Sequence, residues 1–206
     1  MVGHPCCGAE CPTCSPFSLK SALPLGPPDT AYPPPDPLSR ASKLATFCDS
    51  RGLRVHTWPT QIVPSTTIII LDRGAHPPAW TILVHQRADN GHWGLIGGAQ
   101  EVGESIEACA RREALEETGL VVILDCLVCV DSDPCQYAIG LYPTGARQFC
   151  NLTFLARAVP GRLCPSRESR QLEWVTTDHL PQPFLPAHRW RLEQAMQGPT
   201  LGVPVR

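Results

Sequence analysis

One window of the chain, residues 98 to 120 with the sequence GAQEVGESIEACARREALEETGL, restricts its fold and chemistry more than any other feature. Glu113, Glu116 and Glu117 stand three and four residues apart, so in a helix their carboxylates share one face within a single turn. Like charges at this spacing repel one another unless a cation neutralises them. Mg²⁺ and Mn²⁺ prefer oxygen ligands and keep waters or substrate phosphates in their remaining positions. The window therefore predicts a site for a divalent metal and phosphate.

The window also carries the signals that begin and end a helix. Ser105 is a suitable N-cap, and Gly119 stands where a left-handed C-terminal cap is expected. A small apolar stripe would face the core and is formed by Ile106, Cys109, Ala110 and Ala114. Gly97 and Gly98 follow an apolar run, which predicts a strand that enters a tight loop whose backbone approaches a ligand closely.

The shorter segment RREALEETG has a second interpretation, a solvent-exposed helix with Arg and Glu pairs at i and i+4. The whole window is more restrictive, because seven charged or glycine residues must coincide at fixed offsets. They are Gly98, Glu104, Arg112, Glu113, Glu116, Glu117 and Gly119. This coincidence favours the metal and phosphate site over the exposed helix.

The window resembles the Nudix box, in which a glycine, five residues, a glutamate and seven residues precede the pattern R-E-U-x-E-E-x-G-U, where U is apolar. Every specified position matches, with Leu120 at the last U and Ala114, smaller than is usual, at the first. The resemblance, to MutT-like and ADP-ribose pyrophosphatase-like hydrolases, implies the Nudix fold. That fold is of the α/β (α+β) class, a mixed β-sheet sandwiched between α-helices.

The resemblance also implies a role for each residue. The expected metal ligands are Gly98, through its carbonyl oxygen, and Glu104, Glu113, Glu116 and Glu117, with Mg²⁺ as the cofactor and Mn²⁺ as an alternative. Arg112 would hold the glutamates in place by ion pairing. The implied reaction is hydrolysis of a nucleoside diphosphate linked to another group, such as ADP-ribose or a nucleoside triphosphate. Bound metal lowers the pKa of a water, so that the water can attack a phosphorus near neutral pH.

Many Nudix enzymes take a further glutamate from a late loop as general base or extra ligand. Three glutamates follow the window, and Glu168 is the candidate among them because it lies in CPSRESRQLEWV, a polar loop that enters an apolar segment. An ordinary exposed glutamate is the alternative interpretation. We therefore expect Glu113, Glu116, Glu117, Arg112 and Glu168 to carry the chemistry.

The flanking sequence predicts a single domain over residues 46 to 206. Strands are expected at 65 to 71, 80 to 86, 121 to 130, 149 to 159 and 172 to 175, and a closing helix at 187 to 197. Residues 1 to 45 are rich in proline and cysteine, which predicts a disordered arm. Its cysteines, Cys6, Cys7, Cys11 and Cys14, are expected to be free thiols, with Zn²⁺ binding by three of them and His4 as an alternative.

Composition and charge exclude several classes of protein. The formal net charge is −2 and no basic run exceeds two residues, so a nucleic-acid groove is not expected. No signal peptide or membrane-spanning run is evident, and the predicted location is cytoplasmic. Cys126 and Cys129 alternate along an expected core strand, which predicts small buried hydrophobic residues and not a redox pair.

The sequence leaves the substrate open. Pro134 and Tyr137 stand near, but not at, the positions past the box that the family associates with particular nucleotides, and no substrate-binding residue is assigned. Trp93 could stack on a base, although an aromatic residue there more often packs beneath the glycine loop. The expected partner is a small nucleotide, and a homodimer is possible as in many relatives. A catalytically silent nucleotide-binding module is the alternative to an enzyme, and the intact glutamates favour the enzyme.

Overall fold

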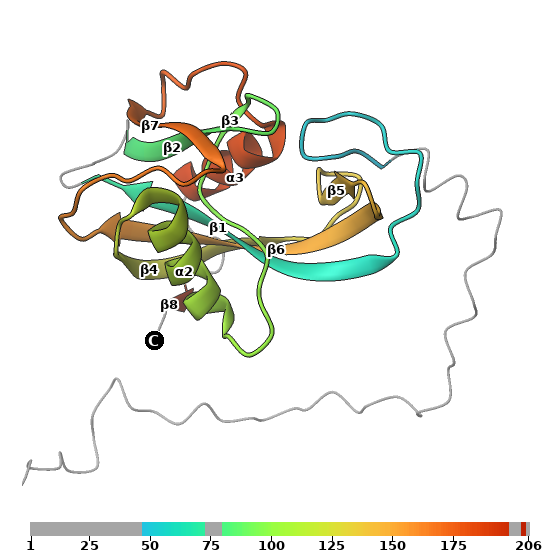
Figure 1. Ribbon diagram of the computed structural model, residues 1–206, viewed down its shortest axis with the longest axis horizontal. Helices are drawn as coiled ribbons and strands as arrows, with labels where there is room; N and C mark the ends of the chain where they lie inside the picture. The colour runs from blue at the N-terminus through green and yellow to red at the C-terminus, as the bar shows by residue number, and fades with distance from the viewer. Residues whose placement is uncertain (1–46, 73–79, 198–202, 205–206) are drawn as a thin grey trace, which may run out of the picture. The chain divides into compact units, whose positions relative to one another are not determined.

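The chain forms a mixed β-sheet with one helix packed on each face (Figure 1). The computed structural model describes residues 47 to 72, 80 to 197 and 203 to 204. The predicted arm at 1 to 45, together with its alternative zinc site, lies outside these residues. The mixed sheet and the two helices confirm the fold class expected from the resemblance.

Eight strands contribute to the sheet in the described part of the chain. They are β1 (Gln61–Leu71), β2 (Thr81–Arg87), β3 (Trp93–Gly94), β4 (Val122–Asp131), β5 (Ile139–Tyr142), β6 (Gly145–Ala158), β7 (Ser169–Thr176) and β8 (Val203–Pro204). The order is β3-β2-β1-β6-β4-β8, while β5 pairs with β6 and β7 pairs with β2. Only the β1 and β6 pair is parallel among these strands, and it runs from Gln61 opposite Arg147 to Leu71 opposite Arg157.

The five predicted strands are present, and three of them, β1, β6 and β7, are longer than the sequence indicated. β1 begins at Gln61 and β6 at Gly145, several residues before their apolar segments start. The extensions of β1 and β6 are strands because these two strands pair with each other, which the pattern along one segment cannot reveal. The short β5 pairs antiparallel with the beginning of β6 and forms a hairpin with it.

Three consecutive isoleucines of β1 show how the sheet separates two cores. Ile68 and Ile70 pack with residues of α2 (Ile106–Thr118), whereas Ile69 packs with residues of α3 (Pro186–Met196). Side chains alternate between the faces of a strand, so a continuous apolar run fills both layers. Figure 1 shows α2 and α3 on either side of β1.

Helix α2 begins and ends where its capping residues predict. The Ser105 side chain accepts a hydrogen bond from the Ala108 N–H at 3.1 Å, and Gly119 adopts a φ of 74°. The Gly119 N–H then donates to the Leu115 carbonyl at 2.8 Å. Both caps satisfy backbone groups that a helix terminus leaves without partners. None of the helices in the described residues is long and apolar enough to cross a membrane.

The two cysteines of β4 differ in exposure. Cys129 is buried and Cys126 is only partly buried, so the prediction of two buried thiols is correct for one of them. The pairing of β4 with β6 shifts register twice, between Leu124 and Cys126 and between Leu127 and Cys129, which breaks the simple alternation that the prediction assumed. Both cysteines are free thiols, as expected.

Candidate metal and phosphate site

The loop that follows β3 lies directly against α2. The Gly97 N–H donates to Glu117 Oε2 at 3.0 Å, and the Gly98 carbonyl accepts from the Thr66 N–H at 2.8 Å. A Cβ atom at Gly98 would collide with the carboxylate of Glu113. Glycine at this position therefore lets the backbone approach the acidic face of the helix, as the sequence predicted.

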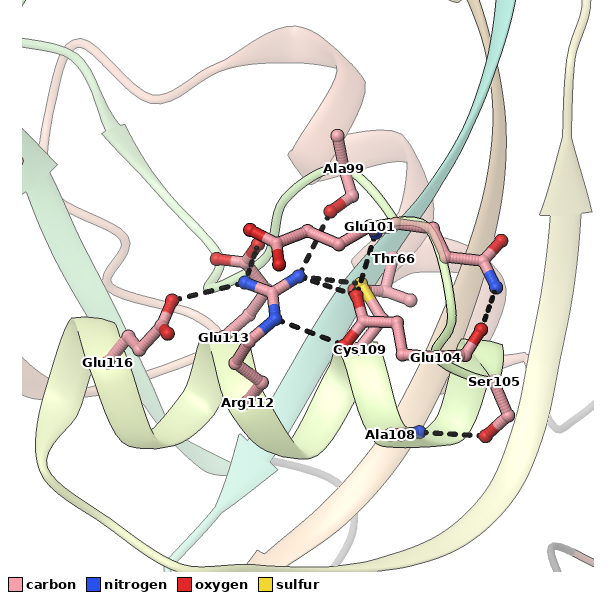
Figure 2. Close-up of polar contacts among 11 residues, drawn as sticks. Thr66, Ala99, Glu101, Glu104, Ser105, Ala108, Cys109, Arg112, Glu113 and Glu116 are labelled. Carbon is pink, nitrogen blue, oxygen red and sulfur yellow. Dashed lines mark hydrogen bonds and ion pairs between the residues drawn. The ribbon is translucent and has the colours of Figure 1, made fainter.

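Arg112 ties three of the expected glutamates together (Figure 2). Its guanidinium holds Glu104 through two hydrogen bonds, from Nη2 at 2.7 Å and from Nε at 3.1 Å. Nη1 donates to Glu113 at 2.8 Å and to Glu116 at 3.1 Å, and Nη2 also reaches the Ala99 carbonyl at 3.1 Å. A single planar donor thus fixes carboxylates from the loop and from two turns of the helix.

The Arg112 network separates the pKa values of its acids. Hydrogen bonds from Arg112 and from the Glu101 N–H lower the pKa of Glu104 to about 2. Hydrogen bonding to Glu104 in turn raises the pKa of Arg112. The pKa of Glu113 is nevertheless raised, because burial of the carboxyl outweighs its contact with Arg112. Glu104 therefore stays ionised near neutral pH, whereas the pKa of Glu113 is shifted upward, toward neutral pH.

Glu117 is the most perturbed acid of the helix. It is 5% exposed, and burial raises its pKa to about 8. The negative charges of Glu113 and Glu168 raise this pKa further, while the Gly97 N–H and Arg87 act in the opposite direction. In the absence of a cation the carboxyl is mostly protonated at neutral pH, so a bound cation would favour its ionised form.

The structure brings Glu168 to the same site. Its exposed side chain lies in the loop before β7, and its carbonyl accepts from the Ala88 N–H at 2.8 Å. Its charge raises the pKa values of both Glu113 and Glu117. A residue more than fifty positions away in the sequence therefore shares the electrostatic environment of the helix glutamates.

The donor set suits a hard divalent cation. It consists of carboxylate oxygens and the Gly98 carbonyl, the ligand types that Mg²⁺ and Mn²⁺ prefer. Within the described residues, no three acidic, histidine or cysteine side chains converge on one point where an ion would be held. The carboxylates do not converge because Arg112 forms ion pairs with three of the glutamates and Glu117 accepts a hydrogen bond from the Gly97 N–H.

A cleft of about 410 Å³ begins at this loop. Gly97, Gly98 and Ala99 line one part of it, together with Arg87, whose charge lowers the pKa of Glu117. Residues of β1, β5, β6 and α3 and of the loops between strands form the rest, and they include Tyr137, Tyr142 and Phe149. Sequence reasoning missed most of these residues because they come from distant segments and none belongs to a motif.

Two aromatic residues considered from the sequence have different positions. Trp93 is 7% exposed and packs with Leu95 and Phe184 in the core beneath α3, so the packing interpretation is correct and base stacking is not. Tyr137 lines the cleft and adopts a φ of 74°, a left-handed conformation that side chains rarely take. Strained residues of this kind cluster at ligand sites.

The family model described as NUDIX domain matches residues 62–196. A MutT-like protein from Streptomyces ambofaciens is 32% identical over 117 residues, which cover 57% of this chain and 69% of that protein. The NAD-capped RNA hydrolase NudC from Vibrio cholerae serotype O1 is 35% identical over 98 residues, which cover 47% of this chain and only 32% of that protein.

A solved structure with a similar fold is the MutT NUDIX hydrolase from Burkholderia pseudomallei. It superposes with a TM-score of 0.52 and 28% identity, over 65% of this chain and 98% of that chain. The range of the family model, residues 62–196, contains the glycine loop, helix α2 and most of the residues that line the cleft.

Proposed function

The chain belongs to the Nudix hydrolase family, and we propose on this basis that it is a Mg²⁺-dependent pyrophosphohydrolase of a nucleoside diphosphate linked to another group. The observation that carries the proposal is the position of the box glutamates. Three of them surround Arg112 and Glu117 contacts Gly97, at the loop where the cleft begins, so a phosphate in the cleft would meet a cation held by the helix.

Glu113, Glu116 and Glu117, with Glu104 and the Gly98 carbonyl, would hold the cation. When bound, the cation neutralises the charge of the pyrophosphate and lowers the pKa of a water molecule. Arg112 keeps the carboxylates oriented, and Arg87 binds phosphate oxygens from the cleft side. Glu168 accepts the proton of the attacking water, a role that its exposure and its nearness to the glutamates support.

A small nucleotide is the proposed substrate. The aromatic residues and Arg87 of the cleft can bind a base and phosphates. The NudC relative is named for NAD-capped RNA, but a formal charge of −2 offers this chain little attraction for a long polyanion. Several cysteines of the described residues are reduced thiols, among them Cys109, Cys129 and Cys150, which supports a reducing compartment such as the cytoplasm.

The test is a substrate panel with purified full-length protein and Mg²⁺ or Mn²⁺. It includes ADP-ribose, NADH, diadenosine polyphosphates and nucleoside triphosphates, with products separated by chromatography. We expect release of a nucleoside monophosphate from one preferred substrate, loss of this activity in Glu116→Gln, and retention in Glu193→Gln, which changes an exposed glutamate on α3. Nucleotide binding without turnover under either metal would overturn the proposal in favour of the catalytically silent module.

A further inference from the structure

An arginine outside the range of the family model lines the cleft. Arg51 stands before residue 62, where the match to the NUDIX domain model begins, so the resemblance assigns it no role. It lies at the tip of a short hairpin in which Cys48 pairs antiparallel with Arg54, while Asp49 pairs in parallel with Ile139 of β5. Figure 1 shows this hairpin, in cyan, beside β5 and apart from α2. The cleft therefore contains a basic group that the Nudix box does not account for.

Contacts at its base and at its tip fix the hairpin beside the cleft. Phe47 and Val55, at its two ends, are buried and pack with Ile139 of β5. The Ala187 N–H of α3 donates to the Ser50 carbonyl at 3.3 Å, and Ser50 itself lines the cleft. The hairpin is thus held by both the sheet and α3, which gives its side chains defined positions.

Asp49 orients the guanidinium of Arg51. Asp49 is 2% exposed, and its Oδ2 accepts hydrogen bonds from Arg51 Nε at 2.9 Å and from Arg51 Nη2 at 2.6 Å. Its Oδ1 accepts from the backbone N–H groups of Arg51 and Leu53, at 2.9 and 3.0 Å. Four donors therefore occupy this carboxylate, and the ion pair holds the arginine in one orientation, as a supporting contact does at a binding site.

The other edge of the Arg51 guanidinium is available to a ligand. Nη1 has no hydrogen-bond partner among the residues that the structure describes, and the side chain is 35% exposed. Nη1 and the second N–H of Nη2 form a fork that matches two oxygens of a phosphate. Arg191, which also lines the cleft, differs because it is 5% exposed and donates to Thr67 and Asp131 through its two Nη atoms. Arg51 therefore offers donors that Arg191 cannot.

The charges near the free edge of Arg51 favour an anion. Asp49 contacts the opposite edge of the guanidinium, so an anion at the free edge would lie closer to the positive charge than to the negative one. Arg147 adds a second positive charge, since its guanidinium lies 4.7 Å from the ring centre of the cleft residue Tyr142. Within the described part of the chain, Arg147 forms no ion pair. The net charge of these three ionised groups is positive.

We propose that Arg51 binds a phosphomonoester that the nucleotide carries in addition to its pyrophosphate, such as a 2′- or 3′-phosphate on the ribose. The pyrophosphate belongs beside Arg87 and the glycine loop, whereas Arg51 reaches the cleft from the hairpin beside β5. In dinucleotide-binding sites, an arginine likewise accommodates a ribose 2′-phosphate. This inference rests on the proposed function, since it names the substrate class of the same cleft.

The first test measures binding without hydrolysis. Wild-type protein with Mg²⁺ is titrated by calorimetry with AMP, adenosine 2′,5′-bisphosphate and adenosine 3′,5′-bisphosphate, and with the corresponding guanosine nucleotides. None of these compounds contains a phosphoanhydride bond, so the Nudix reaction cannot consume them. At least one bisphosphate should bind about 10- to 100-fold more tightly than the monophosphate of the same base, as expected for a charge-assisted pair. The isomer that gains more identifies the position of the extra phosphate.

The second test removes the arginine. Arg51→Gln should reduce the gain from the extra phosphate to within about 3-fold, and Arg51→Lys should keep only part of it because an ammonium lacks the planar fork. Arg157→Gln is the matched control, since it removes one positive charge from a surface pair with Asp125 that does not line the cleft, and it should keep the full gain. If Arg51→Gln does not fold, as judged by circular dichroism, the comparison of nucleotides on the wild type decides alone.

Hydrolysis extends the test to substrates. NADPH is compared with NADH, and coenzyme A with dephospho-coenzyme A, because the members of each pair differ by one ribose phosphate. In at least one pair, the phosphorylated member should show a KM about 10-fold lower and a similar kcat, because the extra contact is made equally in the ground and transition states. Equal KM values within both pairs would overturn the assignment of Arg51 to the substrate.

The outcomes separate this inference from the proposed function. Equal dissociation constants for monophosphates and bisphosphates, or a gain that Arg51→Gln leaves unchanged, would overturn the role of Arg51 and leave the hydrolase intact. Tighter binding of a bisphosphate that depends on Arg51, without hydrolysis of any anhydride under Mg²⁺ or Mn²⁺, would overturn the hydrolase and support the binding site. Absence of measurable binding for every nucleotide of the first test would also overturn the role of Arg51.

Discussion

Replacement of Glu117 by glutamine tests the electrostatics of the site most directly. The carboxyl is buried, and its pKa of about 8 lies well above the ordinary value of 4.5. Each pH unit between these values corresponds to about 1.4 kcal/mol, so ionised Glu117 lowers the free energy of unfolding by about 5 kcal/mol at most. Glutamine avoids this cost and can still accept the Gly97 N–H.

The sign of the effect follows from the protons bound in each state. Below about pH 4.5 Glu117 is protonated in both the folded and the unfolded chain, and ionisation contributes nothing. Between about pH 4.5 and 8 the unfolded chain has lost the proton that the folded chain keeps, so wild-type stability falls as the pH rises. Above about pH 8 both states are ionised and the loss is complete.

The assay is urea unfolding of wild type and Glu117→Gln between about pH 5 and 9, in EDTA. The stability advantage of the variant should grow by about 1.4 kcal/mol per pH unit and level off above pH 8. Glu116→Gln, which changes an exposed carboxylate on the same helix, is the matched control and should show no such growth. A constant difference between wild type and Glu117→Gln across this range would refute the reasoning.

Three further substitutions test the assembly of the site. Arg112→Ala releases the carboxylates of Glu104 and Glu113 and should lower kcat/KM by about 10- to 100-fold. Arg112→Lys should recover little of this activity, because a single amine cannot replace the several N–H donors of the guanidinium. Equal activity in wild type and Arg112→Ala would contradict this expectation. Gly98→Ala pushes a methyl group against Glu113 and should lower kcat by about 100-fold with little change in far-UV circular dichroism, whereas full activity would show that the loop moves freely. Glu168→Gln should lower kcat by about 100-fold or more and leave the melting temperature within about 2 °C, and unchanged kcat would return Glu168 to an ordinary surface residue.

Much of the helix and the placement of its glutamates could be predicted because the information is local. The spacing of Glu113, Glu116 and Glu117 places them on one helix face, and Ser105 and Gly119 mark its ends by hydrogen bonds within a few residues. The apolar segments of β1 and β6 were recognised for the same reason. The first residues of these two strands were not recognised, because pairing between distant strands stabilises them.

The effect of burial on charge could not be read from spacing. Glu116 and Glu117 are neighbours in one motif, yet one is exposed and the other has a pKa near 8 because the glycine loop and the sheet cover it. In the sequence, Glu168 could equally be a general base or an ordinary exposed glutamate. Only the turn before β7 brings its charge to the helix glutamates.

The sequence alone therefore indicated the helix with its caps and the set of acids around which the chemistry is expected, and its resemblance to the Nudix box implied the class of fold. The helix and the shared face of its acids depend on contacts between residues a few positions apart. Tertiary structure decided which of those acids Arg112 pairs with, which of them is buried, and which side chains line the cleft beside them. Arg191 shows the difference most clearly, because its partners Thr67 and Asp131 lie 124 and 60 residues away, and no local pattern connects them.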